Sequence, residues 1–192
     1  FAGVLTVGNI STVTGAQDAS LWMFGASTQT AKLNASSINL EANNNNVFLT
    51  EGSGPELGSD VNVTGDMRVV NGIGGTFVMG ASSTLKVGGN LYLNTKGGSL
   101  LISNGGEEGG ITVGGNFTLM NDVTLSSNVS DVSISAAINS TVVNVAGDIN
   151  VIGTNVGGTG LQMLNGNGTG ITTKNNFNIS SEASGNTTSV IM

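Results

Sequence analysis

A nine-residue alternation of apolar and polar positions recurs along the chain. Its form is Φ-x-Φ-x-Gly-Asn/Asp-Φ-x-Φ, where Φ is an apolar residue. The copies are VNVTGDMRV from Val61, LKVGGNLYL from Leu85, ITVGGNFTL from Ile111, VNVAGDINV from Val143 and the degraded ITTKNNFNI from Ile171. Because alternate side chains of a strand point to opposite faces, the pattern predicts two short strands per copy, each with one buried face.

Two earlier segments, LTVGNIST from Leu5 and LNASSINL from Leu33, follow the same pattern but lack one residue at the corner. The starts near 5, 33, 61, 85, 111, 143 and 171 are therefore 28, 28, 24, 26, 32 and 28 residues apart. A further apolar stretch follows each copy and predicts a third strand per unit. These stretches are SLWMF from Ser20, VFL from Val47, TFVM from Thr76, SLLI from Ser99, VSISA from Val132, LQML from Leu161 and SVIM from Ser189.

One such unit cannot bury its apolar side alone, whereas stacked units can pair their strands in parallel and share one interior. The sequence therefore predicts an all-β fold: one continuous right-handed parallel β-solenoid over residues 1–192, with about seven coils of 24–32 residues. An antiparallel sandwich or barrel is the alternative. It usually shows Asn-Gly or Asp-Gly hairpins, but the order here is Gly-Asn or Gly-Asp, which favours a bend between solenoid faces.

The corner of the motif predicts a structural ladder. Gly65, Gly89, Gly115 and Gly147 are expected to supply a positive φ that only glycine adopts without strain. The residue after each corner is expected to stack on its equivalents and to hydrogen-bond the turn backbone along the rod. These ladder residues are Asp66, Asn90, Asn116, Asp148 and Asn176.

Calcium binding by aligned acids is the rival interpretation of the ladder. Asp66 and Asp148 fall three coils apart with Asn90 and Asn116 between them, which leaves too few carboxylates for each ion. The chain also has no His and no Cys, so imidazole and thiolate ligands are missing. We therefore expect no metal site and no cofactor.

Composition agrees with an all-β chain. There are 31 Gly and 25 Asn but only 9% charged residues, so common helix formers are scarce, while 38% hydrophobic residues argue against disorder. The net charge of −7 and the five scattered cations leave no basic stripe for nucleic acid. No apolar run approaches the roughly 20 residues of a membrane span, so we expect no membrane insertion in this segment.

Catalytic chemistry has few candidates. Without His or Cys, the common acid/base and the thiol nucleophile are missing. Glu107 and Glu108 sit in NGGEEGG, where flanking glycines favour a solvated loop over a convergent pair. We therefore predict a protein that is not an enzyme, and keep a polysaccharide-active β-helix enzyme only as the least favoured alternative.

Outward positions also carry predictions. Tyr92 lies between Leu91 and Leu93, which claim the interior, so its ring is expected to project outward beside Arg68 and Thr118. A flat row of threonines at the outward positions of successive strands would indicate ice binding, and the sequence has no such row. The outward positions of the first strands are Thr6, Asn34, Asn62, Lys86, Thr112, Asn144 and Thr172.

The phrases LKVGGNLYL, ITVGGNFTL and VNVAGDINV, with Asn/Gly/Ser/Thr-rich loops, resemble the passenger regions of bacterial autotransporters and filamentous-haemagglutinin-type adhesins. That resemblance implies a secreted, extracellular rod at the cell surface, whose loops contact a host or neighbouring cell. The loops expected to make such contacts are residues 42–46, 51–60, 104–110 and 121–131.

A filament is the alternative function. The last apolar stretch, SVIM, has no polar cap, so both solenoid ends are expected to expose unpaired strand edges. Such edges would pair with adjoining solenoid segments or with other copies of the chain. The second arrangement is an open head-to-tail assembly, in which the chain is a self-assembling filament subunit.

Overall fold

The computed structural model describes most of the predicted strands and corners. The described residues are 3–12, 21–25, 30–41, 48–52, 58–70, 77–79, 83–94, 100–102, 109–121, 134–135, 141–153, 159–162, 170–181 and 188–191. Every helix or strand element within them is a β-strand, and every recorded strand pair is parallel. The expectation of parallel stacking is confirmed, and the antiparallel alternative is wrong.

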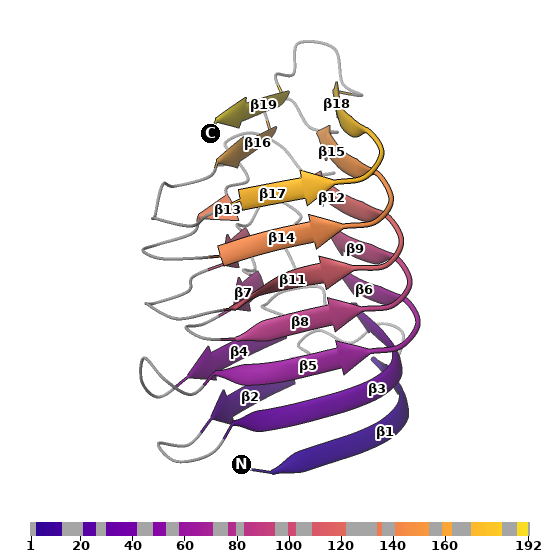
Figure 1. Cartoon of the computed structure of the whole chain (residues 1–192), viewed down its shortest axis with the longest axis vertical. Coiled ribbons are helices and arrows are strands. Elements are labelled where there is room, and N and C mark those ends of the chain that lie inside the picture. Colours follow the sequence, from indigo (N-terminus) through magenta and orange to yellow (C-terminus); the bar gives the residue numbers. More distant parts are fainter. Residues whose placement is uncertain are drawn as a thin grey trace.

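The first two repeats give one long strand each and the five later repeats give two strands each, and these twelve strands build one large sheet. They are β1 (Val4–Ser11), β3 (Ala31–Glu41), β5 (Ser59–Val63), β6 (Met67–Val70), β8 (Thr84–Val87), β9 (Leu91–Asn94), β11 (Gly109–Val113), β12 (Phe117–Asn121), β14 (Thr141–Val145), β15 (Ile149–Gly153), β17 (Gly170–Thr173) and β18 (Phe177–Ser181). Their order is β17-β14-β11-β8-β5-β3-β6-β9-β12-β15-β18, with β1 paired to β3. Eleven parallel strands curve through 301° about an axis, so the sheet wraps around an interior in a solenoid-like arrangement (Figure 1).

The third strand of each repeat forms separate, smaller sheets. One has the order β13-β10-β7-β4-β2 and the other pairs β16 with β19. Each of these strands overlaps a predicted apolar stretch, so the third-strand prediction is confirmed. Their bounds are β2 (Leu21–Gly25), β4 (Phe48–Gly52), β7 (Phe77–Met79), β10 (Leu100–Ile102), β13 (Ile134–Ser135), β16 (Thr159–Gln162) and β19 (Thr188–Ile191).

The strand register follows the sequence repeat. The first residue of each copy pairs with the first residue of the next, for example Val61 with Leu85 and Leu85 with Ile111. The same holds across the longest interval, where Ile111 pairs with Val143. Residues 24 to 32 positions apart therefore lie side by side, despite the uneven loop lengths between them.

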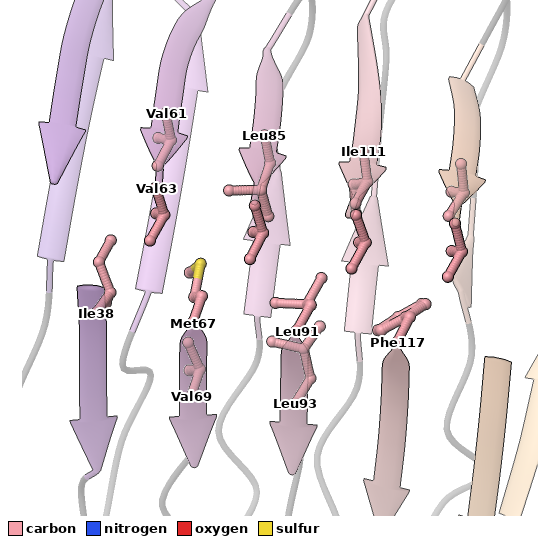
Figure 2. Close-up of a cluster of buried hydrophobic side chains, with 14 of the residues drawn as sticks. Ile38, Val61, Val63, Met67, Val69, Leu85, Leu91, Leu93, Ile111 and Phe117 are labelled. Carbon is pink, nitrogen blue, oxygen red and sulfur yellow. The ribbon is translucent and has the colours of Figure 1, made fainter. Parts of the chain in front are cut away.

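The apolar positions line the interior as the alternation predicts. Val61, Val63, Met67 and Val69 are each 1% exposed, while Asn62, between two of them, faces solvent. Figure 2 shows these side chains lying between the strands on either side of the corner, with their equivalents from neighbouring repeats beside them. Burial of aliphatic columns is the main source of stability in such a stack.

The corner changes along the rod. β1 and β3 run through it unbroken, whereas each later pair of strands is interrupted there. Ala35 pairs with Val63 and Ile38 with Met67, so three residues of the later repeat lie opposite two of β3. The missing corner residue explains this difference, because an extra residue in one strand interrupts the ladder and bends it.

Candidate functional site

The corner residues form a continuous chain of hydrogen bonds along the rod. The backbone N–H of Asn90 donates to Oδ1 of Asp66 at 2.7 Å, and the N–H of Asn116 donates to Oδ1 of Asn90 at 2.9 Å. The N–H of Asp148 donates to Asn116 at 2.9 Å, and that of Asn176 to Asp148 at 3.0 Å. Each side chain therefore accepts the N–H of the next repeat, which fixes the vertical alignment of the corners.

The column begins earlier, in β1 and β3, at residues that the repeat pattern does not predict. In the unbroken strands, the Ser37 hydroxyl donates to Oδ1 of Asn9 at 2.9 Å. Asn9 follows Gly8, but its segment lacks one corner residue, and no glycine precedes Ser37, so the repeat pattern did not mark either as a ladder residue. Their 28-residue separation, which matches the interval between the first repeats, is the signal that could have found them.

The reason predicted for the corner glycines is wrong. None of Gly65, Gly89, Gly115 and Gly147 has a φ in the left-handed range. Space is the constraint instead: a Cβ on Gly115 would lie 2.5 Å from Oδ1 of Asn90 and 2.9 Å from the Gly89 carbonyl oxygen. These positions are glycine because adjacent repeats approach one another closely at the corner.

The position before the corner glycine is equally crowded in two repeats. A Cβ on Gly88 would meet the backbone of Thr64, and one on Gly114 would meet the backbone of Gly88. The repeat pattern does not predict a glycine at this position, because Ala146 and Lys174 occupy it in later repeats.

The ladder oxygens serve the backbone, and the described ranges hold no cluster of three or more His, Cys, Asp or Glu residues suited to a metal ion. The acidic pair Glu107 and Glu108 lies outside the described residues, as do residues 42–46, 53–57, 104–108 and 122–131 of the predicted contact loops. The loop prediction was wrong at the ends of three of these segments: residues 51–52, 59–60, 109–110 and 121 lie in β4, β5, β11 and β12. In the predicted loop 51–60, the structure describes the side chain of one acid, Asp60, whose Oδ2 lies 3.4 Å from the Lys32 ammonium.

A second polar column follows the outward positions of the first strands. From Thr6 to Thr172 the seven positions named from the sequence pair in register. Asn34 Nδ2 donates to the Thr6 hydroxyl at 3.4 Å, and the Thr172 hydroxyl donates to Oδ1 of Asn144 at 2.5 Å. The outward face is therefore a polar surface built mainly from amides and hydroxyls.

Tyr92 occupies the position expected of it. It pairs with Arg68 on one side and Thr118 on the other. The Arg68 guanidinium carbon lies 5.7 Å from the centre of the Tyr92 ring, and Nη1 of Arg68 lies 2.9 Å from Oε2 of Glu41. The Tyr92 hydroxyl donates to Sδ of Met120 at 3.0 Å. These contacts engage both the ring and its hydroxyl within the protein.

The ladder makes a testable contribution to stability. We expect Asn116→Ala to lower the free energy of unfolding by about 1 kcal/mol, because the N–H of Asp148 loses its acceptor. Asn116→Asp keeps an acceptor oxygen and should retain most of that stability at about 1 M salt, where a Debye length of about 3 Å screens the repulsion from Asp148. Urea unfolding of the three proteins measures the difference, and equal losses in both variants would contradict the ladder's role.

The chain matches no protein-family model, no curated protein and no solved structure. No helix in the described ranges has the length and apolarity to cross a bilayer.

Proposed function

We propose that the chain is a non-catalytic, extracellular structural and adhesive rod of a secreted surface protein. The observation that carries this proposal is the in-register parallel pairing that continues from Leu5 to Ile171. Such stacking makes a stiff, quasi-one-dimensional scaffold whose interior is devoted to packing, so that function falls to its surface and loops.

The fold in this proposal is a single right-handed β-solenoid over residues 1–192 with seven coils. Two arguments support it. The strand pairs place each repeat beside the next, and parallel strands joined by crossover connections are overwhelmingly right-handed. An experimental structure of the chain tests both the handedness and the coil number.

Adhesion in this proposal resides in the loops between the third strands and their neighbours, residues 42–46, 51–60, 104–110 and 121–131. The resemblance to passenger regions of surface adhesins supports an extracellular location and contact with another cell. The scarcity of charge on the chain also favours such a scaffold over a reaction centre.

Attachment of coated beads to cells tests this function. Beads carrying the purified chain should attach more than beads carrying albumin, and replacing residues 121–131 and 104–110 with Gly/Ser segments should reduce attachment. The same preparations should release no reducing sugar from polysaccharides. Attachment equal to albumin, or turnover lost with Glu107→Gln and Glu108→Gln, would contradict a non-catalytic adhesive rod.

A filament subunit is the second candidate, and specific exposed side chains favour it. Leu5 on β1 is 47% exposed, and Phe177 and Ile179 on β18 are 38% and 47% exposed. Their equivalents in the central repeats, such as Leu85 in the Leu5 column, are almost fully buried. A second copy stacked end to end would cover these side chains and pair the free strand edges.

Charge substitution at the two ends tests the filament. We expect the unmodified chain to form elongated assemblies whose length grows with concentration, and Leu5→Asp with Ile179→Asp to abolish them, because a buried unpaired carboxylate is costly. Thr6→Asp is the matched control, since Thr6 points outward from the same strand. Electron microscopy and sedimentation measure the outcome. Monomers at all concentrations, or fibres in the double variant, would contradict this assembly.

A further inference from the structure

A hollow of about 390 Å³ lies on the outward face of β3, β5 and β8. Strand register arranges its polar side chains in two rows, one residue from each strand per row. The first row pairs Lys32 with Asp60 and Asp60 with Thr84, and the second pairs Asn34 with Asn62 and Asn62 with Lys86. The hollow is therefore walled by six side chains from three consecutive repeats.

The polar groups of the first row bond one another. The Asp60 carboxylate receives the Lys32 ammonium at 3.4 Å on Oδ2 and the Thr84 hydroxyl at 2.7 Å on Oδ1. Its two charges cancel, so this row offers hydrogen bonds without net charge. Because Asp60 is held from both sides, the row is also a fixed wall of the hollow.

The second row carries the net charge of the site. Asn62 Nδ2 donates weakly to Oδ1 of Asn34 at 3.5 Å, and Lys86 takes the third place in the row. Of the ion pairs found in the described ranges, one holds Lys32 and the other Arg68, and neither involves Lys86. One ammonium group thus stands beside amide and hydroxyl groups, on a chain whose net charge is −7.

We propose that this hollow binds an acidic sugar unit, of the uronic-acid class, through its carboxylate and hydroxyl groups. The carboxylate pairs with the Lys86 ammonium, and the ring hydroxyls exchange hydrogen bonds with the amides of Asn34 and Asn62. The volume lies at the small end of the roughly 300–1,000 Å³ that ligand sites occupy. Three strands span about 10 Å and each row is offset by about 7 Å, a footprint suited to one or two sugar rings.

The charge distribution decides against two other ligand classes. A phosphate group draws on several cations or a bidentate arginine, whereas the hollow offers one ammonium, that of Lys86, with no ion pair among the described residues. A nucleic acid or highly sulfated chain would be repelled at long range by the acidic protein. A single carboxylate surrounded by hydroxyls matches both the one ammonium and the neutral polar groups. The site lies on the strand face. Of the segments proposed above for adhesion it includes only Asp60, which belongs to β5.

Titration of the full chain with a glucuronate-containing disaccharide tests the proposal, with backbone amide shifts as the readout. We expect saturable shifts in β3, β5 and β8 with a Kd of about 1 mM or tighter. The methyl ester of the same disaccharide should bind about tenfold more weakly, because it has no charge for Lys86. Raising the ionic strength should weaken binding of the acid but leave the ester unchanged.

Two variants locate the site. Lys86→Gln should weaken binding of the acidic disaccharide about tenfold, while Lys174→Gln, which removes the same charge from an exposed corner outside the hollow, should not. Asn62→Asp places a carboxylate opposite Lys86 and should compete with the ligand. Absence of saturable shifts up to about 10 mM, equal binding of the ester, or unchanged affinity in Lys86→Gln overturns the proposal. Each of these outcomes leaves the bead-attachment result unaffected.

Discussion

Replacing Phe117 by alanine is expected to lower the free energy of unfolding by about 3–5 kcal/mol. Phe117 is the largest of the fully buried side chains in the described core, at 1% exposure. It packs in register between Leu91 of β9 and Ile149 of β15. Neighbouring repeats hold those strands in place, so the site cannot collapse around the missing ring and a cavity remains. Urea unfolding followed by circular dichroism measures the loss.

The last repeat supplies the matched control. Phe177 occupies the same column as Phe117, two repeats further along, but its side chain is 38% exposed. Phe177→Ala should therefore cost only about 1–2 kcal/mol, since the ring is partly exposed and solvent can fill the space that it leaves. Both variants should be compared at a protein concentration at which the chain is monomeric. Equal losses would mean that the two rings share the same environment, which contradicts the burial gradient along the column.

Register and burial could be predicted because both depend on side-chain alternation. Val61 and Leu85 occupy the same position of the motif. When the repeats stack in parallel, only the register that pairs these two residues buries both side chains. Uneven loops did not obscure this, since the loops lie between the paired segments. The corner hydrogen bonds also followed from sequence, because Asn90 and Asn116 occupy equivalent places and carry an acceptor that a neighbouring N–H can reach.

Features that depend on distances between repeats were not accessible from the sequence. A glycine permits both an unusual backbone torsion and a close approach of another chain segment, and the sequence motif at Gly115 does not show which of the two is required. The position of the Gly89 carbonyl oxygen in the structure shows that the requirement is close approach. The hollow was missed for a related reason. Lys32 and Lys86 come from repeats two steps apart, and their shared wall forms only after the 28- and 24-residue intervals bring three strands into register.

Gly114→Ala is the second substitution with a large expected effect. A Cβ at this position would meet the carbonyl oxygen of Gly88 and lie 3.0 Å from its carbonyl carbon. These are backbone atoms of the preceding repeat, so no side-chain rotation relieves the contact. The repeats must separate locally, which also strains the bond from the Gly114 N–H to the Val87 carbonyl, now 2.8 Å. We expect a loss of about 3 kcal/mol.

Gly8→Ala separates this steric effect from the general consequences of removing a glycine. No atom lies within 4 Å of a Cβ built on Gly8, and its φ is outside the left-handed range. Alanine there should be neutral or stabilise the chain by up to about 1 kcal/mol, because it restricts the unfolded state without a native clash. Hydrogen exchange supplies a local readout: Gly114→Ala should speed exchange at Gly115 and Gly89, whose N–H groups bond the preceding repeats. A Cβ at Gly114 would overlap the backbone of the preceding repeat, and a Cβ at Gly8 would not. A similar loss of stability in both variants would therefore mean that the spacing of repeats at the corner does not set the requirement for glycine.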